Sequence, residues 1–67
     1  MDISVQFGKR VRSLRLRKNM SQGDLAKKLN VDPSYISKIE RGEQNISLKG
    51  IEKLAKALTV SMQELIK

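Results

Sequence analysis

The chain has 67 residues, of which 14 are Lys or Arg and 7 are Asp or Glu, and it contains no Cys, His or Trp. A chain this short is expected to form one small domain over residues 1–67, and without Cys or His it has neither a disulfide framework nor the ligands of an ordinary zinc site. Catalysis by His or Cys is also excluded, and a deep pocket is hard to build at this size. We therefore expect no enzyme activity, no metal or other cofactor, and no small-molecule ligand.

The net charge of +7 and the sequence pI of about 10.2 favour a polyanionic partner, which could be nucleic acid, an anionic membrane or an acidic protein. No apolar run approaches membrane-spanning length, and the N-terminus lacks the pattern of a signal peptide. These features predict a cytoplasmic protein.

The first predicted helix runs from the N-terminus to about Asn19 and is amphipathic. Arg15 lies at the edge of its apolar stripe, Lys9 and Arg12 point away from it, and Leu16 lies nearly opposite without a local explanation. The stripe follows helical spacing and consists of Ile3, Phe7, Val11 and Leu14.

Two short helices are predicted next, each with a clear start signal. Ser21 and Asp24 have the spacing of a capping box, and Asn30 suits the left-handed end of the helix that follows. Asp32 is a good N-cap for the third helix, with Pro33 at the first helical position, where its missing N–H costs nothing. The turn between the helices is about three residues long, as in a helix-turn-helix.

The third predicted helix closes at Gly42 and has two different sides. Its apolar side carries Tyr35, Ile36 and Ile39, with Glu40 at the margin. Its other side carries Ser34, Ser37, Lys38 and Arg41. Small hydroxyl groups can approach base edges closely, and a lysine can donate to guanine O6 or N7, so this side favours reading of a DNA major groove. The alternative is a pair of packed helices that binds nothing.

Ser47 is expected to open a fourth helix, and Ser61 with Glu64 a short fifth one. The fourth helix has Leu48, Ile51, Leu54, Ala55 and Leu58 at core spacing, and the fifth carries Leu65 and Ile66. The predicted fold is therefore all-α: a compact domain of five helices with no strand.

Two polar residues near predicted helix starts are ambiguous. Lys49 lies in the first turn of the fourth helix, where the macrodipole disfavours a cation unless a phosphate binds there. Gln22, at the start of the second helix, could donate to a phosphate. Either side chain could instead simply extend into water.

Arg15 and Glu40 each lie at the border of an apolar stripe, so both are expected to be partly buried. Partly buried opposite charges are costly when they are left alone. We therefore predict a structural salt bridge between Arg15 of the first helix and Glu40 of the third.

Four segments of the chain, residues 12–15, 20–26, 31–42 and 47–58, resemble the Cro/repressor-type helix-turn-helix family. The resemblance covers residues 7–66 and includes a Ser-Gln-x-x-Leu-Ala element from Ser21 and an Ile-Glu-Arg-Gly element that ends at Gly42. Residues 40–48 and the small size are most similar to the controller proteins of restriction–modification systems.

The resemblance implies a homodimer that acts in the prokaryotic cytoplasm or nucleoid and sets its third helices, residues 33–41, into successive major grooves of a near-palindromic DNA operator. It assigns base contacts to Pro33, Ser34, Ser37 and Lys38, and phosphate contacts to Gln22, Tyr35, Arg41, Gln44, Asn45 and Lys49. Pro33 replaces a frequent polar residue, which could remove a base contact. Gln44 stands where controller proteins often have Arg, which implies weaker phosphate anchoring.

The predicted dimer interface lies late in the chain, because family resemblance makes the fifth helix the usual dimer contact. Its apolar residues are Ile46, Val60, Met62, Leu65 and Ile66. The alternative is that some of them, above all Val60 and Leu65, close the core of the monomer.

Three rival functions remain on sequence grounds. A basic amphipathic helix could bind a membrane surface, but this needs Phe7, Val11 and Leu14 to be exposed. Binding of single-stranded RNA lacks a stacking platform, since Phe7 and Tyr35 are the two aromatic residues. An antitoxin or other protein-binding module could use the same scaffold, because a fold does not fix a function.

Overall fold

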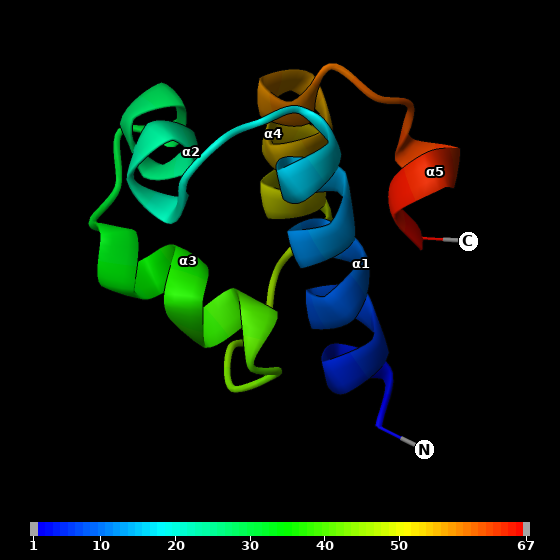
Figure 1. Ribbon diagram of the computed structural model, residues 1–67. Helices are drawn as coiled ribbons and strands as arrows, with labels where there is room; N and C mark the ends of the chain where they lie inside the picture. Colours follow the sequence, from blue (N-terminus) through cyan, green and yellow to red (C-terminus); the bar gives the residue numbers. More distant parts are fainter. Residues whose placement is uncertain (1, 67) are drawn as a thin grey trace.

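The computed structural model describes residues 2–66, which form five helices and no strand. The helices are α1 (Ile3–Arg17), α2 (Gln22–Leu29), α3 (Pro33–Glu40), α4 (Leu48–Leu58) and α5 (Met62–Ile66). In Figure 1, α2 and α3 form one side of the molecule, α1 and α5 lie on the other, and α4 passes behind α1. Helix α3 packs on both α1 and α2, and α5 packs on α1 and α4.

The helices begin where short polar side chains cap their free backbone N–H groups. Ser21 Oγ accepts from the Asp24 N–H and Asp24 accepts from the Ser21 N–H, each at 2.9 Å, which completes the predicted capping box. Asp32 accepts from the Ser34 N–H at 2.8 Å, with Pro33 at the start of α3. Ser47 and Ser61 cap α4 and α5 through the N–H groups of Gly50 and Glu64.

Helices α1 to α4 end in the same way, with a residue in the left-handed region of φ. These residues are Asn19, Asn30, Gly42 and Thr59, with φ of 56°, 58°, 75° and 58°. In each case the next residue donates its N–H to the carbonyl five positions earlier, at 2.9–3.1 Å, as in a Schellman motif. The sequence predicted this conformation at Asn30, and at Gly42 it predicted only the end of the helix. It did not anticipate it at Thr59, whose branched side chain disfavours positive φ.

The core is one cluster to which all five helices contribute. Its buried apolar side chains are Val11, Leu14, Leu25, Ala26, Ile36, Ile39, Leu54, Ala55, Leu58 and Leu65. Phe7, Tyr35 and Ile51 are half-buried and pack against this cluster. The core therefore holds the inner side of α3 and leaves its other side facing solvent.

Two expectations about the ends of these stripes are wrong. Ile3 is 79% exposed and Leu48 is 77% exposed, although each continues the apolar spacing of its helix. Both are the first residue of a helix, at the end of its apolar stripe. Helical spacing fixes the direction in which a side chain points but not whether another element lies there.

Gly8 allows α1 to approach the end of α3 closely. A Cβ atom at this position would lie 2.7 Å from the carbonyl oxygen of Glu40 and even closer to that of Ile39. Both contacts are with backbone, which cannot move aside as a flexible side chain could. The absence of a side chain at Gly8 thus sets the distance between α1 and the C-terminal end of α3.

Candidate nucleic-acid interface

The helix pair α2–α3 has the geometry of a helix-turn-helix. Residues 30–32 form the turn between the two helices, and Ile36 and Ile39 bury one side of α3 beneath α1 and α2. The opposite side of α3 is presented to solvent, as helical spacing predicts. Pro33, Ser34 and Lys38 are exposed there, and Ser37 is half-buried. All four predicted base-reading residues therefore belong to a polar, accessible surface.

The predicted salt bridge between α1 and α3 is present. Arg15 Nε lies 2.7 Å from Glu40 Oε2, and the two side chains are 9% and 5% exposed. A second bond joins Arg15 Nη2 to Glu40 Oε1 at 3.1 Å, and Arg15 Nη1 donates to the Met20 carbonyl at 2.8 Å. This paired geometry fixes the C-terminal end of α3 relative to α1.

Gln22 joins the same network. Its Nε2 donates to Glu40 Oε1 at 3.1 Å, which links the first residue of α2 to the last residue of α3. Sequence reasoning considered this amide only as a phosphate donor or as a solvent-facing group. In this structure it also holds the two helices of the motif together.

A second, exposed network lies at the C-terminal end of α3. Arg41 donates from Nε and Nη2 to the two carboxylate oxygens of Glu43 at 3.1 and 3.2 Å, and from Nη1 to Ser37 Oγ. The bond to the Glu43 carboxylate raises the pKa of Arg41, and the same bond lowers the pKa of Glu43. Both groups are therefore charged at neutral pH.

The other predicted phosphate contacts differ in burial. Lys49 is exposed in the first turn of α4, and Asn45 is exposed in the segment before it. Gln44 is half-buried and its Nε2 donates to the Asn45 carbonyl at 3.4 Å. Tyr35 is half-buried against the core.

The predicted dimer surface needs correction at Leu65. This side chain is 1% exposed and belongs to the core of the monomer, because α5 packs it onto α1 and α4. Val60 and Met62 are half-buried and pack against the same core. Ile66 is 57% exposed and Ile46 is half-buried, so these two remain available as apolar surface.

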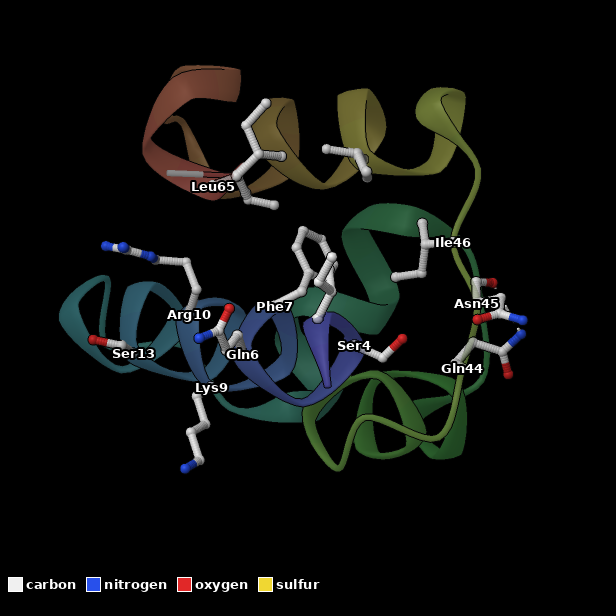
Figure 2. A pocket seen from close by; sticks show the side chains of 13 residues that line it. Ser4, Gln6, Phe7, Lys9, Arg10, Ser13, Gln44, Asn45, Ile46 and Leu65 are labelled. Carbon is white, nitrogen blue, oxygen red and sulfur yellow. Dashed lines mark hydrogen bonds between the residues drawn. The ribbon is translucent and has the colours of Figure 1, made fainter. Parts of the chain in front are cut away.

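Ile46 and Ile66 line an open groove of about 870 Å³ between α1, α5 and the segment before α4. Figure 2 shows Phe7 at the centre of this groove, between Leu65 and Ile46, with Gln44 and Asn45 at one end. The exposed Ile3 of α1 also lines it. Sequence reasoning assigned Ile3 and Phe7 to the core, so it missed the contribution of α1 to this groove. The groove depends on how α1 and α5 pack together. The spacing of residues within one helix does not predict that packing.

The packing of α1 argues against binding of a membrane surface. That reading requires an exposed apolar face beside the basic residues, but Val11 and Leu14 are buried and Phe7 packs against the core. Within residues 2–66, no helix is long and apolar enough to cross a bilayer.

Comparison with known families agrees with this geometry. The model of the helix-turn-helix family matches residues 11–65, which include α2, the turn and α3. The chain belongs to the helix-turn-helix family.

Individual similar proteins indicate which members of the helix-turn-helix family this chain resembles. Control protein C.BamHI of Bacillus amyloliquefaciens is 48% identical over 66 residues, which cover 97% of this chain and 82% of that protein. The crystal structure of the restriction–modification controller protein C.AhdI of Aeromonas hydrophila is also 48% identical, with a TM-score of 0.86 over 91% of this chain and 92% of that one. C.Esp1396I, solved as a tetramer with its natural 35 base-pair operator, is 35% identical, with a TM-score of 0.83 over 100% of this chain and 99% of that one. Within the helix-turn-helix family, the chain groups with these control proteins.

Proposed function

We propose that this chain is a sequence-specific regulator of transcription that binds double-stranded DNA as a homodimer, and that it controls a restriction–modification system. Each subunit inserts α3 into the major groove of one half of a near-palindromic operator. Its place of action is the prokaryotic cytoplasm, at the nucleoid. The resemblance to C.Esp1396I, whose structure contains its operator, supports this proposal.

One observation carries the proposal: the outer side of α3 is polar and accessible while its inner side is held by the core. Ser34 and Lys38 are exposed one turn apart, and both can donate to acceptors on base edges. The buried contacts of Ile36 and Ile39 and the ion pair of Glu40 keep the helix backbone in one position. A rigid element with a short polar surface is what direct reading of bases requires.

The dimer is proposed to form through the groove between α1 and α5. A second copy of the chain can cover the exposed Ile3 and Ile66 that line this groove, together with the half-buried Phe7 and Ile46. Two-fold symmetry of the protein then matches two-fold symmetry of the operator. In this reading Leu65 acts indirectly, by holding α5 against the rest of the subunit.

Two lysine variants test the assignment of roles. Lys38→Ala should lose discrimination at one base pair of the operator, by about 1–3 kcal/mol, because a base contact specifies sequence. Lys49→Ala should weaken binding to all sequences alike and reduce the slope of log affinity against log salt by roughly 0.9, because a phosphate contact carries no sequence information.

Both effects are measured by competition between the operator and duplexes that differ from it by one base pair. Each variant removes one positive charge from an exposed lysine, so each serves as the control for the other. If Lys38→Ala kept the full discrimination of the wild type, α3 would not read bases through this residue.

A further inference from the structure

Ser37 is the one predicted base-reading residue whose side chain is held by another side chain in the described part of the protein. Arg41 lies one helical turn later and donates from Nη1 to Ser37 Oγ. The rest of the guanidinium is held by Glu43, through two bonds of 3.1 and 3.2 Å. A planar guanidinium bound at both edges has little freedom to rotate.

The chemistry of the groups keeps the serine proton out of the bond with Arg41. A guanidinium has only donors, so Arg41 must donate to Ser37 and cannot accept from it. The serine oxygen uses a lone pair on Arg41, and its own hydrogen is left to donate to a different acceptor. Without Arg41, the hydroxyl would have no side-chain partner among the described residues to restrict its rotation.

We propose that Glu43 and Arg41 are positioning residues for specificity, which hold the Ser37 hydroxyl as a donor toward an acceptor on a base edge. This inference rests on the proposed function of α3 in the major groove. Guanine O6 and N7, adenine N7 and thymine O4 are acceptors in that groove, whereas cytosine presents only its N4 amino donor. This chain of contacts from Glu43 through Arg41 to Ser37, called the relay below, therefore favours an acceptor-bearing base at the contact.

The relay also changes the role of Arg41 from the one that family resemblance implies. A phosphate contact would use its charge on the DNA backbone, without regard to sequence. In this structure its donors point to Glu43 and Ser37, and the carboxylate of Glu43 offsets its charge. Glu43 thus restrains Arg41 from the backbone and directs it toward the residue that reads a base.

The test uses the full chain in four forms: wild type, Ser37→Ala, Glu43→Gln and the double variant. Their affinities are measured for the selected operator and for duplexes that differ from it at single base pairs. Glu52→Gln is the matched control, because it makes the same change of charge at an exposed residue of α4. Circular dichroism checks that each variant is folded.

Ser37→Ala should lose roughly three- to ten-fold discrimination at one base pair, the usual range for a single hydrogen bond. Glu43→Gln should lose discrimination at that same base pair, and the double variant should be no worse there than Ser37→Ala. Because Glu43→Gln releases Arg41 to the backbone, its slope of log affinity against log salt should become steeper by roughly 0.9. Glu52→Gln should keep the wild-type discrimination.

Three outcomes would overturn the relay, and they can be told apart. If Glu43→Gln, like Glu52→Gln, raised affinity for all duplexes with discrimination unchanged, Glu43 would act only through its charge. If Ser37→Ala altered no base pair while Lys38→Ala did, α3 would read DNA without the relay. If wild-type protein preferred no duplex sequence at all, the proposed function would fail together with the relay.

Discussion

At the scale of single residues, two ion pairs within residues 2–66 differ in how far they are buried. Arg15 and Glu40 are 9% and 5% exposed and bonded at two points, whereas Arg41 and Glu43 are 53% and 56% exposed. A buried pair is costly to break because one charge is left without a partner, while an exposed pair is replaced by water. The first pair therefore serves the fold, and the second is free to serve recognition.

Glu40→Ala should lower the free energy of unfolding by roughly 3 kcal/mol, because it leaves the buried guanidinium of Arg15 without its carboxylate. Thermal and urea unfolding followed by circular dichroism would measure the loss. Glu43→Ala is the matched control and should leave the melting temperature nearly unchanged. A Glu40→Ala protein as stable as the Glu43→Ala protein would contradict a structural role for the buried pair.

At the scale of elements, capping residues made the helices predictable from the sequence. Ser21, Asp32 and Ser47 mark three helix starts, and Asn30 and Gly42 mark two helix ends, so those bounds follow from local chemistry alone. The polar side of α3 follows from helical spacing in the same way. These features need no knowledge of how the helices pack.

What could not be predicted depends on contacts between elements. Leu48 has core spacing, yet its side chain is exposed. Leu65 was predicted at a dimer surface, although α5 packs it onto α1 and α4. The bond from Gln22 to Glu40 joins residues 18 positions apart. The groove beside Phe7 likewise exists only because α1 and α5 come together. The spacing of residues within one helix does not predict which other helices will pack against it.

The end of α4 gives a prediction at this scale. Thr59 has φ of 58° and is exposed, so a β-branched side chain occupies a conformation that glycine or asparagine adopts at lower cost. Thr59→Gly should raise the free energy of unfolding by about 1 kcal/mol, as judged from the cost of a left-handed L-residue. Urea unfolding would measure the gain. Thr59→Val, which keeps the branch, should give none, and a destabilised Thr59→Gly protein would contradict this account of the helix end.

At the scale of the whole molecule, the basic residues behind the net charge of +7 have different roles. Arg15 is paired inside the fold and Arg41 is held by Glu43, while Lys38 on α3 and Lys49 at the start of α4 face solvent. Excess positive charge attracts any DNA, but attraction alone carries no sequence information. Selectivity is expected from Ser34, Ser37 and Lys38, which contribute little of the total charge.

The groove between α1 and α5 gives the prediction for assembly. Ile66→Glu would place a charge among the apolar residues of the proposed interface and should shift a dimer toward monomer. Sedimentation at tens of micromolar would measure the shift. Leu16→Glu is the matched control, because Leu16 is 52% exposed on the outer side of α1, away from the groove. A wild-type protein that sediments only as a monomer and binds each operator as one copy would contradict the dimer.

Selection of bound sites from random duplex DNA tests the central claim most directly. Two copies of α3 related by two-fold symmetry should enrich a near-palindromic sequence, whose half-sites are centred one helical turn apart, about 34 Å. Enrichment of such a site would support sequence reading by a dimer. Recovery of no sequence preference, or of a single site without symmetry, would contradict it.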